Sequence, residues 1–135
     1  MPKLGDAYVR ALVTGASSGL GLAFSKALLA EGVEVWGTSR NPDSVFNSDK
    51  MHPVKLDLLG EGDVRGWFNQ LDESVGGFDL VINNAGFAVL GEAASLTSSQ
   101  VDAQLRVLLE APLQIGIAAI QGMSLREKGC LVNVS

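Results

Sequence analysis

The chain has 135 residues, of which 47% are hydrophobic and 19% are charged, and its formal net charge is −5. This composition predicts one globular domain, and the acidic balance argues against a nucleic-acid surface, which needs clustered Lys and Arg. A single cysteine excludes an internal disulfide bond and is typical of a reducing compartment. The sequence shows no signal-peptide core and no apolar stretch of the roughly 20 residues that a membrane span needs, so we expect a soluble cytoplasmic protein.

The first part of the sequence alternates between β-rich runs and helical patterns. Residues 8–15 predict a buried strand, and apolar residues then recur at helical spacing as far as Gly32, which stands where a helix cap is expected. Residues 33–39 predict a second strand. Asn41 as an N-cap and Pro42 at the first helical position predict one or two helical turns after that strand.

The same alternation continues to the last residue. The pattern predicts a strand, a helix and a continuously apolar strand at residues 52–58, 61–76 and 78–86. A long helical region follows, from the polar stretch SLTSSQ to about Arg126, and we expect Pro112 to kink or divide it. Residues 129–135 predict a fifth strand.

Strands that are apolar throughout and alternate with helices indicate parallel βαβ units with both sheet faces covered. The sequence therefore predicts an α/β fold, a Rossmann-like doubly wound parallel sheet of about five strands with helices on both faces. The expected strand order is 3-2-1-4-5, and residues 1–135 are expected to form a single domain.

Three glycines stand between the first strand and the first long helix. In a dinucleotide site of this kind, Gly15 makes the tight turn, Gly19 lets the phosphates approach the backbone, and Gly21 lets the helix pack on the sheet. The N-terminus of the helix then presents partial positive charge to a pyrophosphate. The alternative is a turn that needs glycine for its own conformation only.

The second strand ends in Ser39 and Arg40, where a NAD site would have an acidic residue for the ribose 2′-hydroxyl. A hydroxyl beside a guanidinium suits a 2′-phosphate, so this pair favours NADP over NAD. The alternative for Arg40 is an ordinary solvated side chain.

Further polar residues end the third and fourth strands at the same sheet edge. Asp57 is placed to accept a hydrogen bond from an adenine amino group, and helix capping is its alternative role. Asn83 and Asn84 can bind loop backbone groups through their amides, and Gly86 leaves room for a cofactor.

Taken together, these motifs resemble the short-chain dehydrogenase/reductase family. Its T-G-x-x-x-G-x-G pattern matches Thr14–Gly21, its N-N-A-G pattern matches Asn83–Gly86, and its adenine-site aspartate matches Asp57. The resemblance implies binding of NAD(P) and hydride transfer between the nicotinamide and a carbonyl or alcohol, and Ser39 and Arg40 make NADP(H) the expected cofactor. The glycine turn, the Ser39–Arg40 pair and the residues that the resemblance implies together give the expected cofactor-binding set, namely Gly15, Ser17, Ser18, Gly19, Leu20, Gly21, Ser39, Arg40, Asp57, Leu58, Asn84, Ala85, Gly86 and Val107.

The sequence departs from the family in its catalytic residues. The family uses a Ser and a Y-x-x-x-K pair, in which Tyr is the general acid/base, Lys lowers its pKa and Ser binds the reacting oxygen. Tyr8 is the only tyrosine, and Leu108 stands where the family has a supporting Asn. The family serine follows the position of Ser135, so the chain resembles the N-terminal half of such an enzyme, truncated before the catalytic residues.

Three functions therefore remain open for the chain: part of an NADP(H)-dependent oxidoreductase, a nucleotide-binding module without turnover, and an inactive fragment. No residue of the sequence is predicted to be catalytic, and no group has the spacing of metal ligands. Without the rest of a family fold, the fifth strand and the apolar helix would be uncovered, which predicts a homo-oligomer or a poorly soluble protein.

Overall fold

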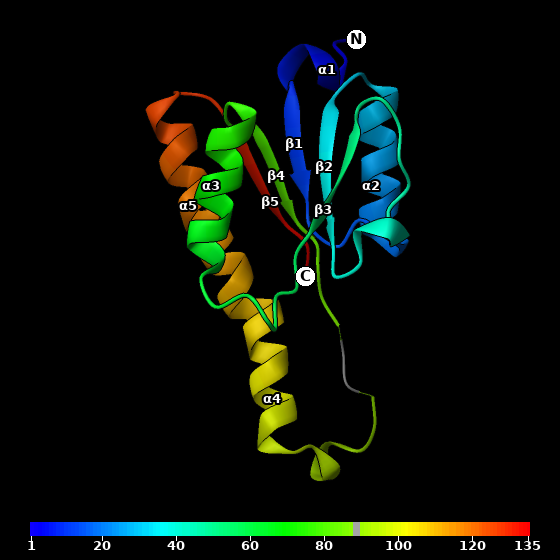
Figure 1. The fold of residues 1–135 in the computed structure, drawn as a ribbon, viewed down its shortest axis with the longest axis vertical. Helices are drawn as coiled ribbons and strands as arrows, with labels where there is room; N and C mark the ends of the chain where they lie inside the picture. The colour runs from blue at the N-terminus through cyan, green and yellow to red at the C-terminus, as the bar shows by residue number, and fades with distance from the viewer. Residues whose placement is uncertain (88–89) are drawn as a thin grey trace.

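A computed structural model describes residues 1–87 and 90–135 of the chain (Figure 1). The described residues form one parallel sheet of five strands in the order β3-β2-β1-β4-β5. The strands are β1 Arg10–Val13, β2 Glu34–Ser39, β3 Met51–Lys55, β4 Leu80–Asn83 and β5 Cys130–Asn133. The predicted Rossmann-like fold and its strand order are confirmed.

Helices connect the strands. They are α1 Leu4–Ala7, α2 Gly19–Ala30, the short 3-10 segments η1 Pro42–Ser44 and η2 Ala93–Ser95, α3 Val64–Val75, α4 Ser98–Leu105, the π-helical segment η3 Arg106–Glu110 and α5 Ala111–Leu125. The sequence did not predict α1, which is a single turn. Several predicted strands extend too far, because their last residues leave the sheet and form the loops at its carboxyl edge.

The sheet is covered on both faces, and successive residues of a strand enter opposite cores. Leu12 of β1 and Val81 of β4 pack in the core that includes α3 and α5, together with Phe68 and Ile115. Their strand neighbours Ala11, Val13, Leu80 and Ile82 lie in the other core, together with Leu28 of α2. This two-sided burial explains why the strands are apolar throughout.

The long helical region is continuous from Ser98 to Leu125, a length of 28 residues. Its N-terminal part projects beyond the carboxyl edge of the sheet (Figure 1). The helix is not divided at Pro112: the irregularity is the π segment just before α5. Pro112 has no N–H to donate and its ring crowds the Leu108 carbonyl four residues earlier, and a wider π turn accommodates both effects.

This helix also meets the length and composition of a membrane span, with a mean hydropathy of 1.3 over its most apolar window. By length and composition, this differs from the expectation that the chain has no stretch long enough for a membrane span. One such helix is weak evidence for a span, because helices of soluble proteins pass the same test, and 33% of that window is buried in this fold.

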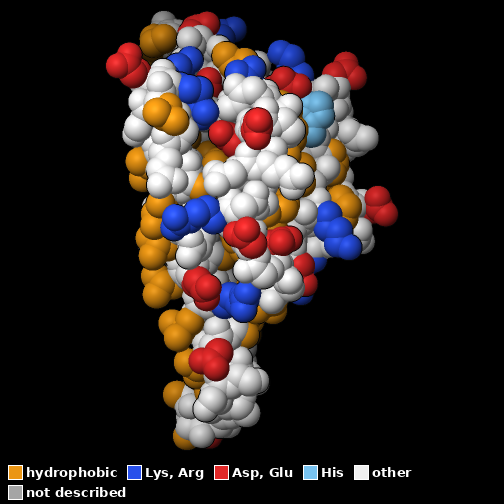
Figure 2. Space-filling view, turned by 60° about the vertical axis from the view of Figure 1, so that its left-hand side comes forward, with side chains coloured by type: hydrophobic (Ala, Val, Ile, Leu, Met, Phe, Trp, Pro, Cys, Tyr) orange, Lys and Arg blue, Asp and Glu red, His pale blue; other side chains and the backbone are white. Residues whose placement is uncertain are grey.

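One side of the molecule carries an uncovered apolar strip. It consists of Leu105, Leu109, Leu113 and Ile120 of the long helix, all of them exposed. Figure 2 shows hydrophobic side chains in a column along the left-hand edge of the molecule. Within the described residues β5 pairs with β4 alone, so its other edge is open as well.

Candidate functional site

The loop between β1 and α2 is shaped by close backbone contacts. Gly15 has a φ of +68°, and a Cβ atom there would lie 2.9 Å from the Cα atom of Ala85. A Cβ atom on Gly21 would overlap the Gly15 carbonyl oxygen and lie 2.6 Å from Asn84 Nδ2. Gly19 has a φ of +56°, and the space around its Cβ position is open to 4 Å. Gly15 and Gly21 therefore serve the packing of the chain, whereas Gly19 keeps the mouth of the loop free of side chains.

The N-terminus of α2 opens at this loop without a side-chain cap. Ser18 is the N-cap residue, and its hydroxyl makes no capping hydrogen bond among the described residues. The N–H groups of the first helical turn are the donors that an anion uses at a helix N-terminus, and the helix dipole adds partial positive charge there. This end of α2 therefore fits a phosphate group.

A network of hydrogen bonds joins the glycine loop to the end of β4. Thr14 Oγ1 accepts from the backbone N–H groups of Asn84 and Ala85, at 3.0 Å each. In return, Asn84 Nδ2 donates to the carbonyl oxygens of Thr14 and Gly15, at 3.2 Å each. The side chain of Asn84 thus binds backbone groups of the loop, as expected from the sequence for an amide at this position.

The neighbouring Asn83 ties three elements together at the same edge. Its Nδ2 atom donates to the Pro112 carbonyl of α5 and to Asn133 Oδ1 of β5, both at 3.0 Å. The start of α5 and the end of β5 are therefore fixed relative to β4.

The end of β2 forms the next part of the site. Thr38 Oγ1 accepts from the Gly15 N–H at 3.2 Å and so connects β2 to the glycine loop. Arg40 is exposed, and its guanidinium has no hydrogen-bond or ion-pair partner among the described residues. Its charge is available to a ligand beside Ser39.

Asp57 follows β3 and lines the groove described below. Its Oδ1 atom accepts from the Leu59 N–H at 3.1 Å and so caps the turn that follows. The Oδ2 atom has no hydrogen-bond partner within the described part of the chain.

These segments surround a groove of about 480 Å³ at the carboxyl edge of the sheet. The groove brings together most of the residues predicted from the sequence, namely Gly15, Ser17, Ser18, Ser39, Arg40, Asp57, Leu58, Asn84, Ala85, Gly86 and Val107. The three others stand apart from its lining: Gly21 is buried beneath the loop, Gly19 lies at the first turn of α2, and Leu20 is 58% exposed.

Sequence reasoning missed four residues that also line the groove, namely Thr38, Leu56, Leu59 and Phe87. Each of them neighbours a residue that was predicted. Their position at the carboxyl edge of the sheet could have identified them. The last residue of a strand and the residues that follow it all lie at that edge, whether or not they belong to a motif.

One residue of the π segment lines the groove. This residue is Val107, which is buried. Leu108, which stands at the position of the family Asn, packs against Gly86, where a Cβ atom would lie 2.9 Å from Leu108 Cδ2. Tyr8 precedes β1 and so belongs to the opposite edge of the sheet. The single tyrosine of the chain therefore lies away from this groove.

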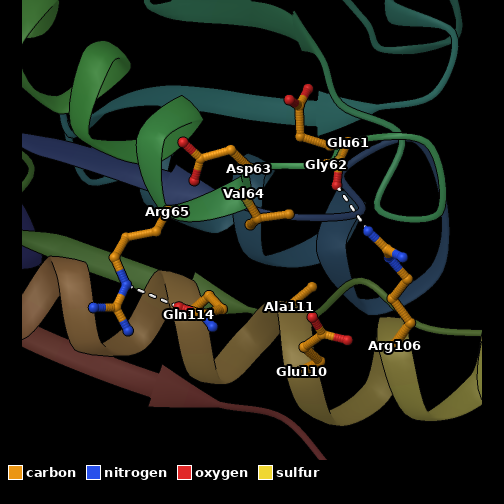
Figure 3. Close-up of a pocket in the computed structure, with 9 residues that line it drawn as sticks. All are labelled: Glu61, Gly62, Asp63, Val64, Arg65, Arg106, Glu110, Ala111 and Gln114. Atoms are coloured by element: carbon orange, nitrogen blue, oxygen red, sulfur yellow. Dashed lines mark hydrogen bonds between the residues drawn. The ribbon is translucent and has the colours of Figure 1, made fainter.

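A smaller hollow of about 180 Å³ lies between the start of α3 and the long helix (Figure 3). Arg65 Nε donates to Gln114 Oε1 at 2.8 Å, and Arg106 Nη2 donates to the Glu61 carbonyl at 3.3 Å. Both guanidinium groups thus bind the protein itself and fasten α3 and its preceding loop to the helix. No group of three potential metal-ligating side chains occurs among the described residues.

The doubly wound sheet, with a groove beside a glycine-rich turn, defines the chain as a Rossmann-like nucleotide-binding type of domain. The model of the short chain dehydrogenase family matches residues 9–135, and the chain belongs to that family. The chain is 36% identical over 139 residues to L-xylulose reductase of Mus musculus, covering 98% of this chain and 54% of that protein. It is 31% identical over 124 residues to 3-ketodihydrosphingosine reductase of Bacteroides thetaiotaomicron, covering 92% of this chain and 45% of that protein.

Solved structures of the family share the fold. A metagenomic short-chain oxidoreductase in complex with NADP has a TM-score of 0.86 and 25% identity, with 96% of this chain and 62% of that chain covered. A 4-hydroxyisoleucine dehydrogenase complexed with NADH has a TM-score of 0.84 and 24% identity, with 94% and 55% covered. The chain therefore spans about half the length of the relatives it matches.

Proposed function

We propose that this chain is the NADP(H)-binding part of a short-chain oxidoreductase that transfers hydride between NADP(H) and a carbonyl or alcohol. The observation that carries the proposal is the groove in which the bare glycine loop, the uncapped start of α2 and the free Arg40 guanidinium meet. When bound, the nicotinamide ring would supply or accept the hydride. The protein residues would hold the pyrophosphate at α2, the adenine at Asp57 and Leu58, and the inner ribose near Asn84–Gly86 and Val107.

The choice of NADP over NAD is the finer part of the proposal. Related structures carry either cofactor, so the fold does not decide between them. Arg40 supports NADP, because a guanidinium can form charge-assisted hydrogen bonds with a 2′-phosphate. An acidic residue, which would repel that phosphate and bind a 2′-hydroxyl, is absent from Ser39, Arg40 and Asn41.

The substitution Arg40→Gln tests this choice. We expect the affinity for NADPH to fall about 10- to 100-fold, the value of one charge-assisted contact, and the affinity for NADH to stay unchanged. Fluorescence titration of both cofactors measures the two dissociation constants. Arg65→Gln is the matched control, since Arg65 lies outside the groove and binds Gln114. Equal losses for both cofactors in Arg40→Gln would contradict a 2′-phosphate site.

A nucleotide-binding module without turnover is the second candidate. Two observations favour it: Leu108, which packs against the groove residue Gly86, stands where the family has Asn, and Tyr8 belongs to the far edge of the sheet. Both candidates predict NADPH binding. They differ in turnover, which is measured as oxidation of NADPH in the presence of a panel of aldehydes and ketones.

The oxidoreductase proposal includes a longer enzyme, in which residues 1–135 form the cofactor domain and the catalytic Ser, Tyr and Lys follow Ser135. The length of the relatives supports it. The coding sequence beyond the Ser135 codon tests it directly: a serine followed by Y-x-x-x-K is expected. A cytoplasmic location belongs to the same proposal and is supported by the single, unpaired Cys130.

We further propose that the 135-residue chain self-associates through its uncovered apolar strip. Exposed leucines beside an open strand edge favour association. Light scattering at tens of micromolar is expected to show a species larger than the monomer, and the double substitution Leu109→Glu/Leu113→Lys is expected to reduce it to a monomer. A monomeric unsubstituted chain would refute this proposal.

A further inference from the structure

Two serine hydroxyl groups and the backbone N–H and carbonyl of Asn41 form a closed ring of hydrogen bonds beside Arg40. The Asn41 N–H donates to Ser39 Oγ at 3.2 Å, the Ser44 hydroxyl donates to the Asn41 carbonyl at 2.5 Å, and the two Oγ atoms lie 3.0 Å apart. A hydroxyl has one proton, and that of Ser44 is held by the Asn41 carbonyl. The hydrogen bond between the two hydroxyls therefore runs from Ser39 to Ser44.

This direction matters for what Ser39 can offer a ligand. Ser39 lines the groove next to Arg40, and these two residues form the proposed 2′-phosphate site. Phosphate oxygens accept hydrogen bonds from the protein, so Ser39 must present its proton to them. In the ring, that proton is already donated to Ser44 Oγ. Binding a phosphate through Ser39 thus requires one internal hydrogen bond to be broken.

We infer that Ser44 limits how strongly the groove prefers a 2′-phosphorylated dinucleotide over its unphosphorylated counterpart, because it competes for the proton of Ser39. This inference rests on the proposed NADP(H) site. Ser44 does not line the groove and acts through Ser39, so it is a positioning residue. Removing its hydroxyl frees a donor at the phosphate position and is therefore expected to strengthen binding.

The loop keeps its shape without the Ser44 hydroxyl. The Ser44 N–H donates to the Asn41 carbonyl at 3.0 Å, and the Val45 N–H donates to the Pro42 carbonyl at 3.1 Å. Asn41 Oδ1 also caps the segment by accepting from the Asp43 N–H at 3.2 Å. The buried Val45 anchors the loop to the core with α2. Substitution of Ser44 therefore changes a proton position and leaves the backbone in place.

The test is the affinity of Ser44→Ala for NADPH and for NADH, measured by fluorescence titration. One neutral hydrogen bond corresponds to roughly a 3- to 10-fold change in an equilibrium constant. We expect the dissociation constant for NADPH to fall by that factor and the constant for NADH to stay the same. Ser44→Thr, which keeps the hydroxyl, is expected to match the original chain. In Ser39→Ala/Ser44→Ala the gain should disappear, since no Ser39 proton remains.

Unchanged or weaker NADPH binding in Ser44→Ala would overturn the inference, and so would an equal gain for both cofactors. Arg40→Gln separates this failure from that of the proposed function. If Arg40→Gln loses selectivity for NADPH while Ser44→Ala gains none, the NADP(H) site stands and only the role of Ser44 is refuted. If the original chain binds neither cofactor, or shows no selectivity that depends on Arg40, both proposals fail.

Discussion

Thr14→Val is expected to lower the free energy of unfolding by about 2–4 kcal/mol. The Thr14 side chain is 2% exposed, and its Oγ1 atom accepts from the N–H groups of both Asn84 and Ala85. Valine fills the same volume but accepts no hydrogen bond, so two backbone donors lose their partner at once. A buried donor without a partner costs about 1–3 kcal/mol. Urea unfolding followed by circular dichroism measures the change.

Thr14→Ser is the matched control for this prediction, because it keeps the hydroxyl and removes one methyl group. It is expected to cost about 1 kcal/mol, the value of one buried methyl group. The two variants should also differ in cofactor affinity. Thr14→Val is expected to bind the dinucleotide more weakly than Thr14→Ser, because valine removes the hydrogen bonds that anchor the loop carrying the proposed phosphate site. If valine destabilises the fold no more than serine does, the hydrogen bonds accepted by the Thr14 hydroxyl contribute little to stability and the prediction is wrong.

Gly21→Ala is expected to abolish dinucleotide binding and to destabilise the fold by about 1–3 kcal/mol. The added methyl group would overlap the Gly15 carbonyl oxygen and press on Asn84 Nδ2, and the first of these is backbone that cannot rotate away. The loop must therefore move off α2, and its N–H groups move with it. Titration with NADPH and urea unfolding measure the two effects.

Gly62→Ala is the comparison for Gly21→Ala, because a Cβ atom on Gly62 has no other atom within 4 Å. Its stability is expected to change by less than about 0.5 kcal/mol, as for most surface substitutions, with NADPH binding retained. A Gly21→Ala chain that binds NADPH normally would show that the proposed phosphate site does not depend on the packing of α2 against the loop.

The sheet was predictable because its signal repeats. Each apolar run between helices indicates a parallel strand, and residues such as Leu12 and Val13 are buried on opposite faces, so neither face needs polar residues. Strand ends were harder to predict, since the final residues of the apolar run 78–86 leave the sheet after Asn83 to bind the glycine loop. Tertiary hydrogen bonds, and not local propensity, set that boundary.

The site was predictable where a residue's backbone role is fixed by its type. Gly15 illustrates this, because its φ of +68° and its contact with Ala85 leave no room for a side chain. The π segment at Arg106–Glu110 was not predictable, since the proline pattern indicates a disturbance without saying how the helix accommodates it. The hydrogen-bond ring of Ser39 and Ser44 could not be predicted from the sequence either, because it depends on where a turn places two hydroxyl groups.

The hydrogen bonds between Thr14 and Asn84 join residues 70 positions apart, which has a consequence for the order of folding. A partly folded chain with β1, β2 and β3 in place still has an unanchored glycine loop, because the partners of Thr14 arrive with β4. Closing a loop of that length has an entropic cost that local helix formation does not have, so such contacts form slowly. During synthesis, the groove can be completed only after the segment around Asn84 has left the ribosome. Acquisition of nucleotide affinity would therefore mark a late folding step, the pairing of β1 with β4.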